Sequence, residues 1–297
     1  MSNQLNNRTG LLELHIAVLL FGGTALFSKL IPLSALDITL LRCFIAAIVL
    51  ALLVKSMGSR LRLNSQKDYF VAIGLGVIVS LHWVTYFASM QLSSVAIGMI
   101  AFFTYPVMTV LIEPLFTKTR LKRADLLSGL VVLIGVGLLI PEATLGNDVT
   151  LGIAVGVLSA MFFTARNLLH KRYFASYSGA QAMFYQTLVA VLFLLPWHEV
   201  EISSIEQHVW WLILLLGVVF TAAPHALFTS ALRQLSAKTV SLVSCLQPLY
   251  GALLALLLLG ETLELKTVIG GLLVVITAVY ETQQSHKQSR QQQRTTD

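Results

Sequence analysis

Glu113 is a carboxylate inside an apolar stretch, and it is the residue whose type says most about possible chemistry in this sequence. It shares a helical face with Phe102, Tyr105 and Thr109, because residues three or four positions apart lie on one side of a helix. An ionised carboxylate in lipid costs about 2 to 3 kcal/mol, so this side chain must face a polar interior or be protonated. Glu113 either carries a coupled proton or binds a substrate amine, or it is a structural partner of Lys118 or of a neighbouring arginine, or it snorkels to the interface.

Two histidines fall near the middle of apolar segments, where an imidazole can contact a substrate or carry a proton. His82 is followed by Trp83 and, one turn later, by Tyr86, which together predict an aromatic and titratable wall beside the face of Phe102. His225 holds almost the equivalent position in the second half of the chain. The alternative for both histidines is a neutral side chain hydrogen-bonded to a neighbouring helix.

A short stripe of polar and small residues surrounds Pro248. It consists of Ser241, Ser244, Gln247 and Gly251. A proline inside a helix frees a backbone carbonyl one turn earlier. Pro106 stands at the corresponding place in the first half, so two broken helices are predicted. The stripe is interpreted either as part of a substrate site or as packing serines.

Three cations stand in or beside apolar segments. Lys29 and Arg166 are expected at opposite membrane faces as snorkelling anchors, with ion pairs of a gate as the alternative. Arg42 follows Asp37 by five residues and is expected near the external interface. There it stabilises a helix end or, alternatively, contacts a substrate carboxylate or forms an external gate.

Membrane-spanning helices must position these residues. Of 297 residues, 56% are apolar and 11% are charged, whereas soluble proteins carry about a quarter charged residues. The basic residues behind the net charge of +6 form short clusters between apolar runs, which favours membrane flanks over a nucleic-acid surface. Apolar runs long enough to cross a bilayer predict ten spans: Leu11–Leu30, Ala35–Val54, Tyr69–Met90, Ser94–Phe116, Ala124–Ile140, Val149–Leu169, Gly179–Leu195, Val209–Leu232, Ala237–Leu259 and Leu265–Tyr280.

The charges between these spans predict the orientation. Basic clusters at 55–67, 118–123, 171–172, 233–238 and 287–294 share the side of Arg8, whereas the acidic loops at 142–148, 199–206 and 261–264 lie opposite. The positive-inside rule then places both termini in the cytoplasm of an inner-membrane protein. Residues 1–10 are a short cytoplasmic segment, and residues 283–297 are predicted to be a disordered cytoplasmic tail because they lack apolar residues.

The two halves look like copies of one five-helix unit, over residues 11–140 and 149–282. A shift of 142 positions superposes Ser94 on Ser236, Pro106 on Pro248 and Gly129 on Gly271 without a gap. Five is odd, so the second copy must cross the membrane in the opposite sense. The basic loop at 55–67 indeed corresponds to the acidic loop at 198–208. The sequence therefore predicts an all-α membrane protein of ten helices in two inverted repeats, as in transporters that work by alternating access.

The motifs carry a resemblance to a known family. They are Phe21-Gly-Gly-Thr with Lys29 at the end of the first span, Arg42, the prolines Pro106 and Pro248, and Gly260-Glu261-Thr-Leu before Gly270-Gly271. Over about 11–280 the chain resembles the drug/metabolite transporter superfamily, specifically its ten-helix EamA-type family. The resemblance implies a central cavity between the first, third, fourth, sixth, eighth and ninth spans. Similar proteins include amino-acid and metabolite exporters and riboflavin importers, so the direction of transport stays open.

Other classes of function are disfavoured by missing motifs. The sequence has no phosphate-binding Gly-x-x-x-x-Gly-Lys loop, no Gly-x-Ser-x-Gly elbow and no His-Glu-x-x-His, so neither an ATP-driven pump nor an enzyme is expected. Cys43 and Cys245 lie in different apolar runs, which favours neither a disulfide nor a metal site, and no cofactor is expected.

The predicted function is secondary transport of a small organic metabolite. The aromatic residues favour a planar or aromatic compound, such as a riboflavin-like vitamin or an amino acid. The alternatives are an amino-acid or drug exporter of the same fold and, from another class, a non-transporting receptor or regulatory subunit. The expected partners are the substrate and the lipid bilayer, with no nucleic acid. Gly152 and Gly156 allow close helix packing, which is expected within one monomer. A homodimer stays a possible assembly.

Overall fold

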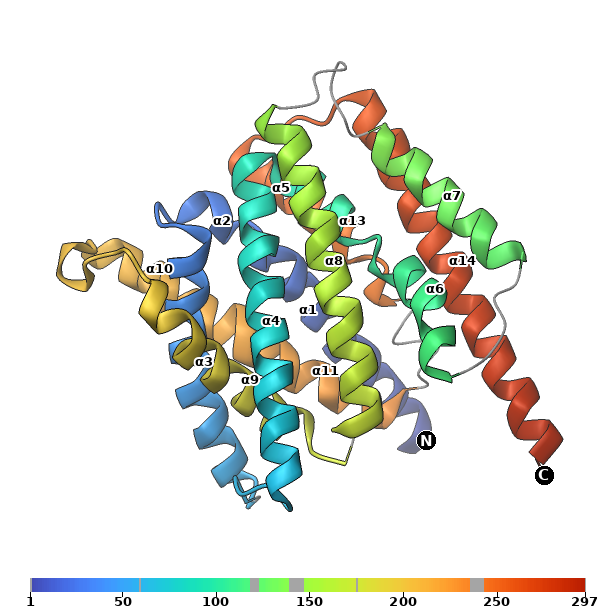
Figure 1. The fold of residues 1–297 in the computed structure, drawn as a ribbon, viewed down its shortest axis with the longest axis horizontal. Helices are drawn as coiled ribbons and strands as arrows, with labels where there is room; N and C mark the ends of the chain where they lie inside the picture. The colour runs from blue at the N-terminus through green and yellow to red at the C-terminus, as the bar shows by residue number, and fades with distance from the viewer. Residues whose placement is uncertain are drawn as a thin grey trace.

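The computed structural model of this chain describes residues 2–58, 60–117, 123–138, 147–174, 176–235 and 243–296, and these contain helices and no strand. The elements are α1 (Ser2–Thr24), α2 (Phe27–Leu30), α3 (Ala35–Ser56), α4 (Gln66–Leu92), α5 (Val95–Phe102), α6 (Tyr105–Thr117), α7 (Arg123–Gly137), α8 (Asp148–Tyr173), α9 (Gly179–Leu194), η1 (Leu195–Trp197), η2 (Ile202–Ser204), α10 (Gln207–Gly217), η3 (Val218–Ala222), α11 (Ala223–Gln234), α13 (Gln247–Leu259) and α14 (Leu265–Thr296). Figure 1 shows them packed as one helical bundle.

Seven segments of the described residues are long and apolar enough to cross a membrane. They are Thr9–Leu30, Ala35–Ser56, Gln66–Leu92, Val95–Pro114, Asp148–Tyr173, Gly179–Trp197 and Gln207–His225. Gln247–Leu259 and Leu265–Tyr280 are apolar helices of shorter length. The chain is therefore a multi-pass membrane protein, and the count of ten spans stays a prediction.

Short polar side chains set the starts of several helices. Ser34 accepts a hydrogen bond from the backbone of α3, Ser94 does so for α5 and Ser178 for α9. At α4, Ser65 and Asp68 form a reciprocal capping box. Such caps satisfy backbone N–H groups that have no partner inside the helix, which explains why the predicted and observed starts agree closely.

The predicted helix breaks are present at both prolines. α5 ends at Phe102 and α6 begins at Tyr105, directly before Pro106, while a turn at Cys245 and Leu246 precedes α13 and Pro248. The eighth predicted span is also irregular, because the π-helical segment η3 precedes Pro224.

A contact between the two halves satisfies a carbonyl at this π-helical segment. Pro224 has no N–H to donate to the carbonyl of Phe220, four residues earlier. The hydroxyl of Thr24, on α1, donates a hydrogen bond of 2.9 Å to that carbonyl instead. An irregular helix is tolerated inside a membrane where such a group supplies the missing bond.

Contacts between the halves occur in equivalent pairs. α4 packs on α8 as α1 packs on α11, and α5 packs on α8 as α1 packs on α13. α3 lies against α9, α5 against α13 and α7 against α14, so each of these spans meets its counterpart. This is the pattern expected when a two-fold axis relates two copies of one unit.

Gly152 and Gly156 pack inside the monomer, as predicted. A Cβ atom at Gly152 would lie 2.9 Å from the Ser89 carbonyl, and one at Gly156 would lie 2.8 Å from the Ala101 Cβ. Both glycines therefore let α8 approach α4 and α5 closely.

The C-terminal helix differs from the prediction. α7 and α14 lie side by side at one edge of the bundle, and α14 continues to Thr296 (Figure 1). Residues 283–296 were predicted to be disordered, yet they continue this helix. The segment has no glycine or proline and is rich in Gln with some Arg, which propagate a helix readily once it has begun.

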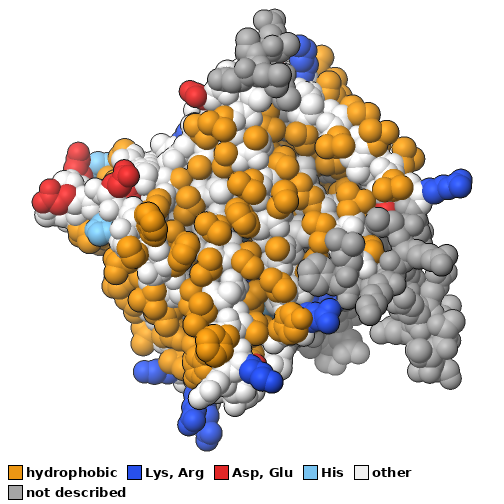
Figure 2. Space-filling view, viewed as in Figure 1, with side chains coloured by type: hydrophobic (Ala, Val, Ile, Leu, Met, Phe, Trp, Pro, Cys, Tyr) orange, Lys and Arg blue, Asp and Glu red, His pale blue; other side chains and the backbone are white. Residues whose placement is uncertain are grey.

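The surface is apolar around the helices and charged at the ends. Hydrophobic side chains cover most of the face in Figure 2, whereas Lys and Arg gather along its lower edge. Large apolar residues of α3 and α4 point outward, including Phe44, Ile48 and Phe70, which is 74% exposed. Such residues are stable outside the bundle only if lipid covers them.

Hydrogen bonds join the two halves at the basic end. The Tyr177 hydroxyl, before α9, donates to the Asp68 carboxylate at 2.6 Å and accepts from the Asn64 amide at 2.8 Å. Burial raises the pKa of Tyr177, and the bond to Asp68 adds to this effect.

A carboxylate joins the halves at the opposite end. Glu261, after α13, accepts bonds from the backbone N–H groups of Val95 and Ala96 at 3.0 and 3.4 Å, at the start of α5. Lys29 lies at the same end, where its ammonium donates to the carbonyls of Gln91 and Ser93, as expected for an interfacial anchor.

Candidate functional site

An aromatic cluster lies where α4, the α5–α6 break and α8 meet. The His82 ring centroid is 5.2 Å from that of Phe102 and 4.9 Å from that of Phe163. Phe102 is stacked on Tyr105 at 5.2 Å and meets Tyr86 edge to face at 5.2 Å. The structure thus brings together four residues that the sequence singled out: His82, Tyr86, Phe102 and Tyr105.

Phe163 is a member of this cluster that the sequence analysis missed. Its centroid is 4.8 Å from that of Tyr105. It lies in α8, which is apolar on several faces, so neither residue type nor spacing marked the face that points inward.

His82 is held by a buried hydrogen-bonded pair. Its Nδ1 lies 2.8 Å from the Ser159 hydroxyl oxygen, and that hydroxyl lies 2.9 Å from the His82 carbonyl. Both residues are buried, at 4% and 0% exposure. The pair joins α4 to α8 and fixes the imidazole against the rings, as the hydrogen-bonded interpretation of this histidine expected.

A second cluster lies between α1 and α11. The His225 ring is 5.0 Å from that of Phe21, which is 6.0 Å from that of Phe228. His225 therefore contacts the first predicted span as His82 contacts the sixth. The first and sixth spans occupy equivalent positions in the two copies. Each copy therefore contributes one histidine that packs on a phenylalanine of the other copy.

The start of α13 faces the first cluster. Gln247 lies beside the Tyr86 hydroxyl, and Cys245 lies near Tyr105. Ser244 is half-buried just before this turn. The polar stripe of the sequence analysis therefore meets the aromatic wall at the second broken helix.

Trp83, whose ring centroid is 6.5 Å from that of His82, covers Arg42. The guanidinium carbon of Arg42 lies 4.4 Å from the Trp83 ring centroid and 5.1 Å from that of Phe87. Arg42 is only 2% exposed and Trp83 8%. Arg42 was expected near the external interface, and its side chain lies between aromatic rings of α4 rather than on the surface of the bundle.

Arg166 is also not a snorkelling anchor. Its Nε donates to the Gln186 side-chain oxygen at 2.7 Å, and its Nη1 to that of Asn167 at 2.9 Å. Nη2 lies 3.3 Å from the Met183 sulfur. These neutral groups of α8 and α9 hold the guanidinium within the bundle.

Glu113 lies apart from both histidines, in an ion pair at the basic end. Its Oε1 is 3.0 Å from the Lys171 ammonium, and the two side chains are 29% and 76% exposed. A cation from a neighbouring span was one of the expected partners, although the sequence suggested an arginine, and Lys118 lies outside the described residues. A role for Glu113 in proton coupling stays a proposal.

We expect Glu113→Gln to have a small effect. An ion pair with one largely exposed partner contributes about 1 kcal/mol or less. Exchange and pH-gradient-driven flux, measured in the same vesicles at matched protein content, should both stay close to wild type. Loss of the gradient-driven flux with exchange retained would instead assign the coupled proton to Glu113.

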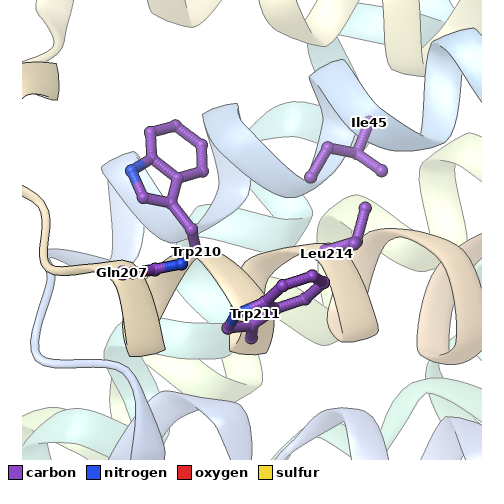
Figure 3. A pocket seen from close by; sticks show the side chains of 5 residues that line it. All are labelled: Ile45, Gln207, Trp210, Trp211 and Leu214. Carbon is purple, nitrogen blue, oxygen red and sulfur yellow. The ribbon is translucent and has the colours of Figure 1, made fainter.

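A pocket of about 310 Å³ lies on the outer face of the bundle. It is lined by Ile45, Gln207, Trp210, Trp211 and Leu214. Figure 3 shows the tryptophans at the start of α10, with Ile45 on a neighbouring helix. Its lining carries no charge, and Trp211 is 63% exposed. Tryptophan is typical of the membrane interface, so the candidate site is placed in the interior rather than here.

Sequence comparison agrees with the repeat and the helical architecture. The model of the EamA-like transporter family matches twice, over residues 8–140 and 150–280. The chain belongs to the EamA-like transporter family. Each half of the EamA chain is therefore one copy of the family unit, and a small-molecule transporter is the function class that the family indicates.

Individual relatives agree with this family. The chain is 25% identical to the uncharacterised transporter YxxF of Bacillus subtilis (strain 168), over 88% of this chain and 86% of that protein. It is 26% identical to the pseudopaline exporter CntI of Pseudomonas aeruginosa (strain PAO1), over 83% and 86%. It is 25% identical to the inner membrane transporter YicL of Salmonella typhimurium (strain LT2), over 96% and 99%.

A solved crystal structure has a similar fold. It superposes with a TM-score of 0.61 at 18% identity, over 96% of this chain and 99% of that one. At this identity the likeness shows the fold and carries no statement about substrate.

Proposed function

We propose that this protein is a secondary transporter that moves a small organic metabolite across the inner membrane by alternating access. The metabolite has a planar or aromatic portion. The observation that carries the proposal is the aromatic cluster of His82, Phe102, Tyr105 and Phe163 at a broken helix between the copies. Broken helices at a repeat interface are where transporters of this kind bind their substrates.

The path of the chain is part of the proposal. Ten spans, with repeats at 11–140 and 149–282 in opposite senses, leave the segments 1–10 and 283–297 in the cytoplasm. Two features support it: the alternation of basic and acidic loops, and the paired contacts such as α4 with α8 and α1 with α11.

Fusion reporters test this path. Reporters placed after Asn64 and after Asp297 should read cytoplasmic, whereas reporters after Asn147 and Ser204 should read external, because basic flanks are retained inside. Alkaline phosphatase and a fluorescent protein fused at each site give opposite signals. An external C-terminus would contradict the count of ten spans.

Counterflow in proteoliposomes that contain only this protein tests transport itself. Vesicles preloaded with members of a metabolite panel, including flavins and aromatic amino acids, should accumulate the labelled form of a transported compound. A receptor or regulatory subunit would show no counterflow with any member. Export rather than import, as the name of the relative CntI suggests for that protein, would appear as resistance of cells to toxic analogues.

A matched pair of variants connects transport to the cluster. Phe102→Leu keeps an apolar side chain but removes the ring, so we expect the half-saturating substrate concentration to rise about five-fold or more, or about 1 kcal/mol. Phe70→Leu makes the same change on the outer face of the bundle, where the side chain is 74% exposed. This variant should leave the half-saturating substrate concentration unchanged. Equal behaviour of the two variants would remove the cluster from the proposed site.

A further inference from the structure

Arg42 is a cation buried inside the bundle. Among the described residues, no carboxylate lies within ion-pair distance of its guanidinium, and its Nε has no hydrogen-bond partner. Its neighbours are the rings of Trp83 and Phe87 and the Cys43 thiol. Cation–π contacts stabilise a buried cation by about 2 kcal/mol, which is less than the several kcal/mol of free energy that burying an unpaired charge costs. Such a charge inside a membrane protein calls for a functional explanation.

A second polar atom near Arg42 is also unsatisfied. The Tyr86 hydroxyl is buried, and the Gln247 side chain beside it makes no well-formed hydrogen bond with it. Tyr86 lies within electrostatic range of Arg42. Both groups can donate a hydrogen bond, and the guanidinium has no capacity to accept one. A ligand that accepts several bonds and carries negative charge would satisfy both.

The planar shape of the guanidinium narrows the chemistry of this ligand. The rings of Trp83 and Phe87 pack on Arg42, while its N–H groups point along the plane of the guanidinium. A carboxylate matches that edge with two parallel hydrogen bonds, which are among the strongest in proteins.

A second interior arginine lies toward the other side of the membrane. Arg42 is seven residues from the first residue of α3 (42 − 35), and Arg166 is seven residues from the last residue of α8 (173 − 166). At 1.5 Å per residue, each lies about 10 Å inside its helix end. In the proposed topology these ends face opposite sides of the membrane. Both arginines lie within electrostatic range of His82 and of His225.

We propose that the transported metabolite carries a carboxylate, which the Arg42 guanidinium and the Tyr86 hydroxyl bind between α3 and α4. The inference rests on the proposed transport function and names the class of its substrate. The rings of the aromatic cluster contact the planar portion of the molecule. Arg166 attracts the same anion on the cytoplasmic side, so an anion meets a cation from either entrance.

The test measures binding, independently of transport. The melting temperature of the purified full-length protein is recorded with benzoate against benzamide, and with indole-3-acetate against indole-3-acetamide. Phenyl phosphate is the comparison for a non-carboxylate anion. We expect the carboxylates to raise the melting temperature and the uncharged amides of nearly the same shape to leave it unchanged.

Variants assign the effect to these residues. Arg42→Gln should abolish the response to carboxylates. Arg62→Gln, which removes an exposed arginine of the α3–α4 loop, should keep it. Tyr86→Phe removes a hydroxyl that makes no well-formed hydrogen bond, so the protein should fold normally and bind the carboxylates about ten-fold or more weakly. This variant keeps the test decisive even if Arg42→Gln does not fold.

Several outcomes would overturn the proposal. They are no shift with any of the carboxylates, an equal shift with the amides, a larger shift with phenyl phosphate, or a carboxylate response that survives in Tyr86→Phe at full affinity. Counterflow of uncharged metabolites together with any of these results would retain transport and reject the carboxylate. Carboxylate binding without any counterflow would retain the carboxylate site and reject the proposed transport function.

Discussion

Replacement of Gly152 by Val should remove most of the folded protein. A Cβ atom at this position would lie 2.9 Å from the Ser89 carbonyl oxygen and 3.1 Å from the Ser93 backbone nitrogen. These are backbone atoms at the end of α4, so no side chain can rotate to make room. The Ser89 hydroxyl also donates a 2.7 Å bond to the Gly152 carbonyl, and separating the helices would break it. We expect a loss of about 3 kcal/mol or more, beyond the usual cost of overpacking.

The same substitution at Gly74 is the matched control. Gly74 lies in α4, and a Cβ atom there would meet nothing within 4 Å. Valine has a better helix propensity than glycine, so Gly74→Val should melt at or slightly above the wild-type temperature. Thermal unfolding of the purified proteins, followed by size-exclusion chromatography, measures both. Equal melting of the two variants would show that the α4–α8 contact at Gly152 is looser than described.

Trp83→Ala should destabilise the protein almost as strongly. The ring is 8% exposed and packs with Cys43, Ala46 and Val79, so its removal leaves a large cavity. Truncating a buried aromatic side chain costs about 3 to 5 kcal/mol. The change also uncovers the Arg42 guanidinium, which lies 4.4 Å from the ring centroid, and removes a cation–π contact of about 2 kcal/mol.

Three comparisons separate these causes. Trp83→Phe keeps an aromatic face and should recover most of the stability. Trp211→Ala removes a tryptophan that is 63% exposed and should change stability by about 0.5 kcal/mol or less. In a double-mutant cycle with Arg42→Gln, the loss caused by Trp83→Ala should shrink, because the two residues are in contact. A full loss in the Arg42→Gln background would assign the whole effect to the cavity.

The architecture was largely predictable because its signals are local. The span predicted at Ala35–Val54 is α3 at Ala35–Ser56, and that at Gly179–Leu195 contains α9 at Gly179–Leu194. Apolar length, capping serines and prolines act within a few residues of where they stand, so they can be recognised without the tertiary structure. The repeat could also be recognised, because it was retained in residue types such as Pro106 and Pro248.

Part of the candidate site was predictable for the same reason. His82 and Tyr86 lie four residues apart in α4, and helical spacing brings such residues onto one face. Phe102 and Tyr105 were expected on one face of a single span, and they stack instead across the break between α5 and α6. The inward orientation of this face could be predicted because polar and aromatic groups accumulate on it. Gln247 also lies beside this wall, at the break that Pro248 predicts.

The sequence by itself thus determined the family, the helices and one wall of the site, while the tertiary structure decided which other residues face it. Phe163 lies in the cluster and Phe44 on the outer surface, although both stand in apolar helices of similar composition. Around a soluble protein, polar residues would mark the outer face, but lipid is as apolar as the core and leaves no such pattern. Arg42 could therefore be placed between Trp83 and Phe87, and Glu113 beside Lys171, only once the helices were packed.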